Sequence, residues 1–271
     1  MTELRDATEV ALADLLSLRG RAAVVTGGAQ GLGKAIARRF AEAGASVVIG
    51  DRNLAQAEAA AAELAGRYGA DVIAVPLDVA DEASVHACAG TCVERFGAID
   101  IWVNNAGVFP ALPIGHMTLA DWEQVFAVNA RGTFLGAQAA SRAMAGSGGV
   151  IVNVASLAGI KGIAPALSAY VSSKHAVVGL TRQLAIELAP QRIRVLAIAP
   201  SFVVTEGNLA LMQGNEQVTK AAAEDIPSMF QSKLGRVGVP DDIARVALFC
   251  ASDMALFMTG TTLVVDAGES A

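Results

Sequence analysis

Short apolar runs alternate with longer amphipathic stretches along nearly the whole chain from Arg21 onward. The runs read AAVVTG, SVVIG, VIAVPLD, IDIWVNNAG, VIVNVAS, IRVLAIAP and TTLVVD. The stretches between them predict helices over residues 31–43, 54–68, 82–96, 119–144, 169–189 and 241–250. Because right-handed crossovers place helices on both faces of a parallel sheet, this order predicts one α/β domain over residues 21–271 with a doubly wound, seven-stranded parallel sheet.

The composition is that of a chain whose strands are buried on both faces, since hydrophobic residues make up 54% of the 271 residues and charged residues 17%. The net charge of −6, without a dense run of Lys or Arg, argues against nucleic acid as a partner. The cysteines Cys88, Cys92 and Cys250 have neither disulfide-framework nor metal-ligand spacing, so we expect no metal site and a reducing, cytoplasmic location. No run of 18 apolar residues occurs, so we expect no membrane partner.

Two segments lie outside the alternation. Residues 1–20 carry Leu and Ala at helical spacing, which predicts a helical extension packed on the body or on a neighbouring subunit; a frayed tail is the alternative. They lack the positive region and long apolar core of a signal peptide. Residues 206–235 form a long polar stretch, which predicts a functional lid.

A glycine-rich loop, Thr26 to Gly33, joins the first strand to the first helix of the alternation. In this context Gly27 permits a tight turn, Gly31 a close approach of the backbone to a pyrophosphate, and Gly33 close packing of the helix, whose first N–H groups face the anion. The pattern predicts a Rossmann-type dinucleotide site, and a plain strand-to-helix turn is the alternative. We assign to the cofactor the loop residues Gly27, Gln30, Gly31, Leu32 and Gly33.

The cofactor is predicted to be NAD. Asp51 ends the second strand, where a carboxylate accepts hydrogen bonds from a ribose hydroxyl and repels a 2′-phosphate. Arg52 follows it and is also assigned to the cofactor, where it could meet a phosphate, but no basic residue lies between Gly27 and Gly33. Asp78, with Val79 beside it, closes the third strand and is expected to accept from the adenine amino group. The alternative for Asp78 is a turn residue before a helix.

Tyr170 and Lys174 lie four residues apart on one face of a predicted helix. We expect the ammonium group and a positively charged nicotinamide to favour the phenolate and so to make Tyr170 a usable acid/base. Ser156 ends a buried strand, where its hydroxyl is expected to hold the substrate oxygen and the Tyr170 hydroxyl. Asn129 is unusual within a long helix; an interrupted helix that carries a water to Lys174 would explain it, as would a locally capped polar residue.

Together these motifs resemble the short-chain dehydrogenase/reductase family, in its NAD-dependent alcohol dehydrogenase type, from about Arg21 to Gly268. The resemblance implies a catalytic set of Asn129, Ser156, Tyr170 and Lys174. It also implies cofactor contacts: the ribose beside Asn105, Ala106 and Gly107 and held by Tyr170 and Lys174, and the carboxamide held by Val203 and Thr205.

The chain departs from the family pattern in three places. Ser201 follows Pro200 where glycine is usual, Ala267 stands where a second glycine is common, and Ser156 and Tyr170 are 14 residues apart, one more than expected. These departures concern the shape of the substrate site more than the reaction.

The expected reaction is hydride transfer between NAD and a small-molecule secondary alcohol or ketone. Phe109, Ala158, Ala164 and part of residues 209–230 are expected to reach the substrate, and this largely apolar set favours a secondary, cyclic or steroid-like alcohol. The alternatives are a 3-ketoacyl thioester reductase, which Asp51 disfavours, and a catalytically silent dinucleotide-binding protein. A serine hydrolase is disfavoured because Ser156 lacks the GxSxG context.

The family resemblance also implies a homotetramer, with a homodimer as the alternative. Apolar residues on the helices after strands four and five, and the run 257–265, are expected to form the interfaces. The competing interpretation is that these side chains face the core of their own subunit. The helix residues concerned are Phe126, Phe134, Leu135, Ala137, Val177, Val178 and Leu184.

Overall fold

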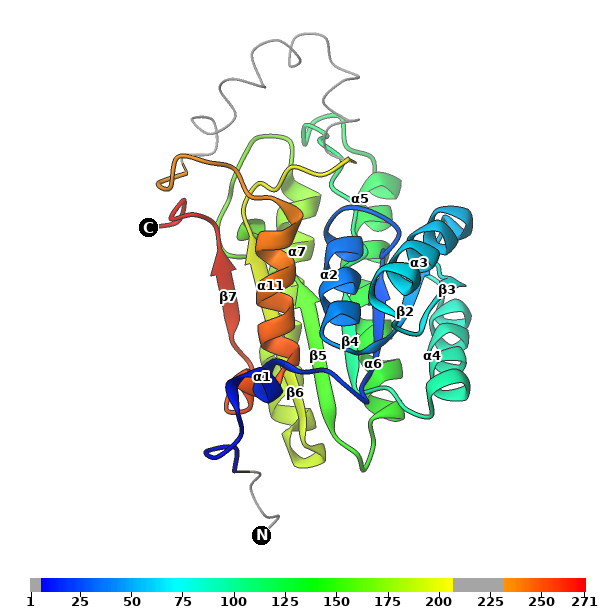
Figure 1. Cartoon of the computed structure of the whole chain (residues 1–271). Coiled ribbons are helices and arrows are strands. Elements are labelled where there is room, and N and C mark those ends of the chain that lie inside the picture. The colour runs from blue at the N-terminus through cyan, green and yellow to red at the C-terminus, as the bar shows by residue number, and fades with distance from the viewer. Residues whose placement is uncertain (1–5, 207–231) are drawn as a thin grey trace.

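The computed structural model describes residues 6–206 and 232–271 and contains one seven-stranded sheet in the order β3-β2-β1-β4-β5-β6-β7 (Figure 1). Every neighbouring pair of strands is parallel, which confirms the predicted doubly wound fold. The strands are β1 (Ala22–Thr26), β2 (Ser46–Asp51), β3 (Val72–Pro76), β4 (Ile101–Asn104), β5 (Gly149–Val154), β6 (Ile193–Pro200) and β7 (Thr262–Val265).

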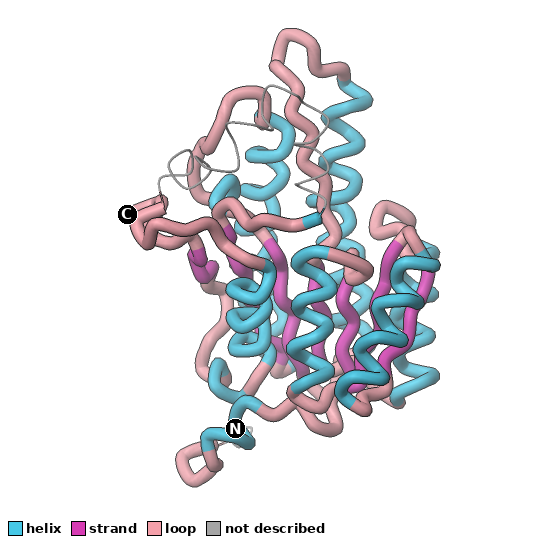
Figure 2. Tube along the Cα trace, turned by 45° about the horizontal axis from the view of Figure 1, so that its top comes forward, coloured by secondary structure: helices cyan, strands magenta, loops and turns pink. Residues whose placement is uncertain are grey.

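Helices cover both faces of this sheet, as Figures 1 and 2 show. One face packs against α2 (Gly31–Glu42), α3 (Leu54–Tyr68) and α11 (Pro240–Ala251). The other face packs against α4 (Glu82–Phe96), α6 (Gly132–Ala143) and α7 (Ser168–Leu188). Strand β1 is buried throughout because its side chains alternate between these two cores: Ala23 and Val25 enter the first, and Ala22 and Val24 the second.

The carboxyl ends of the strands lie at the top of Figure 1. The strand order reverses between β1 and β4, which pair directly, with Val25 opposite Val103. In open α/β sheets ligands bind at such a reversal, outside the carboxyl ends of the strands. The fold therefore brings the loops after β1 and β4 together at one edge.

The predicted helix over residues 119–144 is interrupted. It consists of α5 (Leu119–Phe126), a π-helical turn (Ala127–Arg131) and α6. The π-helical turn contains Asn129, whose backbone carbonyl accepts a hydrogen bond from the Thr133 hydroxyl at 2.7 Å. This interruption agrees with the alternative in which Asn129 breaks the helix.

Of the N-terminal extension, predicted to be helical over residues 1–20, residues 6–20 are described. A helix is present only as α1 (Leu12–Leu16), and none of its residues is buried. The segment is held by Leu18, which follows the helix and is fully buried. Of the predicted lid, only Glu206 and residues 232–235 lie within the described residues.

Several residues expected at subunit interfaces face the core of their own chain instead. Leu135, Ala137, Val177 and Val178 are all buried, so the competing interpretation is right for them. Phe134 is 45% exposed and still available to a partner. Among residues 6–206 and 232–271, no helix has the length and apolar character that a membrane span requires.

Candidate active site

The glycine loop between β1 and α2 is shaped by positions where a side chain does not fit. Gly27 and Gly31 have φ angles of 63° and 55°, which favour glycine. A Cβ atom on Gly33 would overlap the carbonyl oxygen of Gly27 and would lie 2.6 Å from Nδ2 of Asn105. The positive φ of Gly27 agrees with the predicted tight turn. Gly33 makes room for the loop itself more than for the sheet, and the approach of Gly31 to a pyrophosphate stays a prediction.

The loop after β4 is hydrogen-bonded to the glycine loop and holds it in place. The Asn105 amide donates to the carbonyl oxygens of Thr26 and Gly27 at 2.9 and 3.0 Å. The Thr26 hydroxyl accepts from the backbone N–H groups of Asn105 and Ala106 at 3.0 and 3.1 Å. Asn105, expected beside the cofactor, thus uses its side chain to hold the loop in which the phosphates would lie.

A carboxylate lies at the N-terminus of α2. The Gly31 N–H donates to Oε2 of Glu206 at 3.2 Å, and the methyl group of Thr205 lies 3.4 Å from the point where a Gly31 Cβ would stand. The carboxylate stands in for a phosphate oxygen, because the start of a helix favours an anion of either kind. The shape and the donors of the loop therefore fit a pyrophosphate.

The basic side chains nearest this loop are already paired. Lys34 contacts Glu63 at 2.7 Å, and Arg38 contacts Asp241 at 2.6 Å. An anion at the loop would therefore be bound mainly by backbone N–H groups and not by these cations. The Gln30 side chain accepts a hydrogen bond from Gln56 at 3.1 Å, and Leu32 packs against the core.

Asp51 ends β2 at the same edge. Its two carboxylate oxygens accept hydrogen bonds from the backbone N–H groups of Ala29 at 3.1 Å and Asn53 at 3.0 Å. Asp51 thereby joins the glycine loop to the start of α3, while Arg52 points to solvent. The position of Asp51 agrees with a contact to a ribose bound along the loop.

The residues expected at the adenine differ in exposure. Asp78 is exposed and accepts from the Ala80 N–H at 2.9 Å, so its turn role is observed. Val79 is buried and packs beside Gly132, where a Cβ would lie 2.9 Å from it. An adenine contact for either residue stays a prediction.

Ser156, Tyr170 and Lys174 meet above the carboxyl ends of β5 and β6. The Ser156 hydroxyl lies near enough to Tyr170 to lower the pKa of the phenol, and the Ser156 oxygen accepts a hydrogen bond from the Ala158 N–H at 3.1 Å. The Lys174 ammonium group is buried and donates to the Val154 carbonyl oxygen at 2.8 Å. The structure thus brings Ser156 and Tyr170 together, and a hydrogen bond between their hydroxyls stays a prediction.

Burial is the largest influence on the pKa values of Tyr170 and Lys174. It raises the pKa of the Tyr170 phenol, and the nearby Ser156 hydroxyl offsets this rise only in part. Burial also lowers the pKa of Lys174 to about 8. In the chain by itself the loss of solvation outweighs the favourable contacts, so the pKa of the phenol is raised. The expected lowering by Lys174 together with a positively charged nicotinamide stays a prediction.

Asn129 is buried within the π-helical turn and bonds to the segment after β4. Its side chain accepts from the Val108 N–H at 2.9 Å and donates to the Val108 carbonyl oxygen at 2.8 Å. It also donates to the Ser173 hydroxyl at 3.0 Å, and Ser173 donates to the Tyr170 carbonyl oxygen at 2.8 Å. Sequence reasoning missed Ser173, since a serine beside Lys174 gives no periodic signal; its full burial is a property of the fold.

The residues expected at the substrate separate into two groups. Phe109 is 43% exposed and meets the Tyr170 ring edge-on at 6.1 Å, and Ala164 is also exposed. Ala158 is fully buried, which removes it from direct contact with a substrate and corrects that expectation. Val203 is buried, and Gly107 leaves a Cβ position 3.6 Å from the Lys174 ammonium nitrogen.

Comparison with known proteins agrees with this geometry. A short-chain type dehydrogenase/reductase from Mycobacterium marinum has a similar structure, with a TM-score of 0.87, 35% identity, and coverage of 96% of this chain and 99% of that one. Residues 27–270 also match the family described as enoyl-(acyl carrier protein) reductase. The chain belongs to the short-chain dehydrogenase/reductase family. As a member, it is an oxidoreductase that uses a nicotinamide dinucleotide.

Relatives within the family differ in what they act on. A D-threitol dehydrogenase of Mycolicibacterium smegmatis is 41% identical over 93% of both chains. A 3-oxoacyl-[acyl-carrier-protein] reductase of Aquifex aeolicus is 36% identical over 93% of this chain and 98% of its own. Similarity to these proteins thus shows the reaction type and leaves the substrate to be argued from the site.

Proposed function

We propose that this short-chain dehydrogenase/reductase interconverts a secondary alcohol and a ketone with NAD(H). The observation that carries the proposal is the Ser156–Tyr170–Lys174 cluster at the carboxyl edge, beside a loop that accepts an anion. When bound, the nicotinamide ring supplies the hydride acceptor for oxidation and the donor for reduction. The side chains of the protein transfer the proton and position the substrate oxygen.

Ser156 and Tyr170 would hold the reacting oxygen between their hydroxyls. In ketone reduction the Tyr170 O–H donates its proton to the substrate oxygen, and in alcohol oxidation the Tyr170 oxygen accepts that proton. The raised pKa of Tyr170 keeps the phenol protonated at neutral pH and so suits the first direction. Lys174 lies on the same helix face as Tyr170, and its charge favours the phenolate that alcohol oxidation needs. The π-helical turn at Asn129 would hold a water molecule that exchanges protons with Lys174.

Asp51 supports NAD over NADP. A 2′-phosphate on a ribose at the end of β2 would meet this carboxylate, and like charges at such a contact are costly. The neighbouring cations Lys34 and Arg38 are held by Glu63 and Asp241, so they are not placed to offset that repulsion.

The exposed apolar groups around Tyr170 favour a substrate with a hydrophobic body, such as a cyclic alcohol. Phe109 presents its ring to the Tyr170 side of the site, and Ile163 is 40% exposed on the loop before α7. A 3-ketoacyl thioester is the second candidate substrate, because the Aquifex relative is named a 3-oxoacyl-[acyl-carrier-protein] reductase. Asp51 argues against it if that reaction is driven by NADPH.

A cofactor-coupled screen tests the proposal. Purified protein is mixed with NAD or NADP and cyclohexanol, a 3-hydroxysteroid, D-threitol or sorbitol, and NAD(P)H is followed by absorbance; the matching ketones and a 3-ketoacyl thioester are tested in reverse. We expect turnover with NAD(H) on a cyclic substrate. Turnover of the thioester with NADPH alone would support the second candidate, and no turnover with any pair would contradict the proposal.

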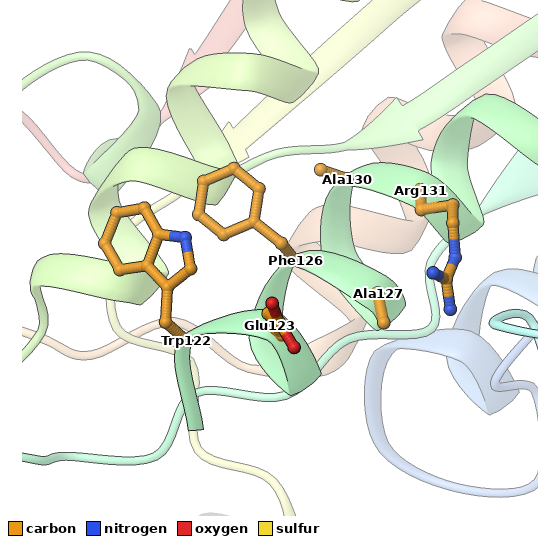
Figure 3. A pocket seen from close by; sticks show the side chains of 6 residues that line it. All are labelled: Trp122, Glu123, Phe126, Ala127, Ala130 and Arg131. Atoms are coloured by element: carbon orange, nitrogen blue, oxygen red, sulfur yellow. The ribbon is translucent and has the colours of Figure 1, made fainter. Parts of the chain in front are cut away.

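We also propose that the enzyme assembles as a homotetramer, with a homodimer as the alternative. We place it in the reducing cytoplasm, where its three buried thiols would stay free. Trp122 and Phe126 stack at 4.7 Å on the outer side of α5, in a hollow that Arg131 borders (Figure 3). Phe257 is fully exposed, and Val264 is 42% exposed on the edge strand β7. A second copy would bury both surfaces. Light scattering would contradict assembly if it gave the 27.6 kDa of one chain.

A further inference from the structure

Ser173 lies between Tyr170 and Lys174 in the first turns of α7 and is fully buried, although its side chain is polar. Its hydroxyl accepts a hydrogen bond from Nδ2 of Asn129 at 3.0 Å. The same hydroxyl donates to the backbone carbonyl oxygen of Tyr170 at 2.8 Å. Ser173 therefore joins the π-helical turn to the turn of α7 that carries the proposed acid/base.

The Asn129 amide extends this connection to the segment after β4. Its oxygen accepts from the Val108 N–H at 2.9 Å, and its nitrogen donates to the Val108 carbonyl oxygen at 2.8 Å. Phe109, the next residue, meets the Tyr170 ring edge-on at 6.1 Å. The chain of hydrogen bonds that starts at Val108 and passes through Asn129 therefore begins and ends beside Tyr170.

The first turn of α7 begins without a side-chain cap among the described residues. Its N-cap residue, Leu167, has no polar side chain to offer the helix. The first turn of a helix leaves four N–H groups without intrahelical partners, so this end opens more easily than the middle. Lys174 holds the following turn by donating to the Val154 carbonyl oxygen at 2.8 Å. The bond between Ser173 and Asn129 thus ties the turn of Tyr170 itself to a neighbouring element.

A second buried hydroxyl on α7 makes the same kind of contact away from the site. Thr181 accepts from Nδ2 of Asn153 at 2.9 Å and donates to the Val177 carbonyl oxygen at 2.8 Å. Thr181 and Ser173 are both 0% exposed, but Thr181 lies about three helical turns beyond Tyr170. The two hydroxyls therefore match in burial and in bonding, and they differ in how far along the helix they lie from Tyr170.

We propose that Ser173 is a positioning residue, which through Asn129 fixes the turn of α7 that carries Tyr170 against the segment after β4. This inference rests on the proposed function. The one O–H donor of Ser173 is used by the Tyr170 carbonyl oxygen, so Ser173 acts through Tyr170 and not on the substrate. Because a small misplacement of a reacting group slows a reaction strongly, loss of this bond lowers kcat.

The test compares Ser173→Ala with Thr181→Val as the matched control. Each change removes a buried hydroxyl that makes two hydrogen bonds, so each should lower Tm by a few degrees. Only Ser173→Ala should lower kcat for the oxidation of cyclohexanol with NAD, by about ten- to a hundredfold. Ser173→Cys, whose thiol is a weak donor and acceptor, should lower kcat in the same direction. Equal losses of kcat in Ser173→Ala and Thr181→Val, or none in either, would overturn the inference.

A double-mutant cycle shows whether Ser173 acts through Asn129. Asn129→Ala alone should lower kcat, because it breaks the same chain of hydrogen bonds. Adding Ser173→Ala to Asn129→Ala should lower kcat by no more than about a further twofold, since residues in one hydrogen-bond network are not additive. A further loss as large as the one Ser173→Ala causes in the wild type would mean that Ser173 acts independently of Asn129, which contradicts the proposal.

Hydrogen exchange provides a measurement that needs no substrate. The backbone amides of Val108 and of residues 171–174 should exchange faster in Ser173→Ala than in the wild type, and Thr181→Val should leave their exchange unchanged. Unchanged exchange of these amides in Ser173→Ala would overturn the inference. If the wild type turns over none of the screened alcohols, the proposed function fails, and the exchange result alone decides whether Ser173 positions the turn.

Discussion

The ammonium nitrogen of Lys174 lies 5.8 Å from the centre of the Tyr170 ring, one helical turn away on α7. Loss of solvation around this pair raises the pKa of Tyr170 and lowers that of Lys174 to about 8. The burial that sets these pKa values also opposes the charge on Lys174, so the catalytic arrangement costs folding stability.

Lys174→Met should raise stability while abolishing activity. A pKa lowered from 10.5 to about 8 corresponds to roughly 3 kcal/mol against the charged form. The lost hydrogen bond to Val154 offsets about 1 kcal/mol of this, so a net gain of about 1–2 kcal/mol and a Tm higher by a few degrees are expected at pH 7. Differential scanning calorimetry measures this, with the exposed Lys233→Met as control.

The same lysine gives a pH dependence with a defined sign. Between about pH 8 and 10.5 the unfolded chain binds the Lys174 proton and the folded chain does not, so the wild type should gain stability relative to Lys174→Met as pH rises through this window. A difference in Tm that stays constant from pH 7 to 10 would contradict the burial of a charged Lys174.

Tyr170→Phe should lower kcat by about 10²–10⁴-fold, since a positioned acid/base group contributes that much. NADH affinity should change little, because the ring and its edge contact with Phe109 remain. Stopped-flow turnover and NADH fluorescence measure the two effects separately. Retained turnover would remove Tyr170 from the proton transfer.

We expect the wild type to prefer NAD over NADP by at least about tenfold in kcat/KM. Asp51→Asn should reduce this preference. The amide keeps an acceptor for one of the N–H groups of Ala29 and Asn53 while removing the charge. Asp51→Ala should narrow the preference too, with an added loss of stability. The ratio of kcat/KM for the two cofactors is the measurement, and equal ratios in wild type and variant would contradict the assignment.

Glu206→Gln should tighten NADH binding. The Glu206 carboxylate accepts from the Gly31 N–H, which a phosphate oxygen would need, so a neutral amide competes less well for the helix N-terminus. We expect the Kd to fall about three- to tenfold. Glu94→Gln controls for the change in net charge, and weaker binding in Glu206→Gln would mean that the carboxylate supports the cofactor.

Ala267→Gly should raise Tm by about 1–3 °C. Relief of the positive φ of 51° stabilises the folded state by about 1–2 kcal/mol, and the added freedom of the unfolded chain removes about 0.4–1 kcal/mol of that. Thermal unfolding of the variant measures the difference. A lower Tm would show that the Ala267 methyl group packs against its surroundings.

Periodicity predicted the strands and the helix over residues 54–68 well, because buried parallel strands and amphipathic helices each have a distinct spacing. It predicted Ser156, Tyr170 and Lys174 as one cluster because strand ends and helix faces converge at the carboxyl edge. An interrupted helix at Asn129 was expected from the residue type, but the bonds of its side chain to Val108 were not, because Val108 lies 21 residues away in the segment after β4.

Burial was harder to predict than position. Ala158 and Val177 were expected at a ligand or a partner, yet each is fully buried. An apolar residue in a chain this hydrophobic gives no sign of which neighbour covers it. The contact of Glu206 with Gly31 likewise joins residues 175 apart in sequence, and only the three-dimensional fold reveals it.

The pairing of β1 with β4 also bears on how the chain folds. Ala23 lies opposite Ile101, so the chain from β2 to α4 must close as one long loop when the central pair forms. Contacts of such long sequence separation slow folding. On refolding from denaturant, helical circular dichroism should therefore return before NADH binding, and the interval between them would leave apolar strand edges open to aggregation.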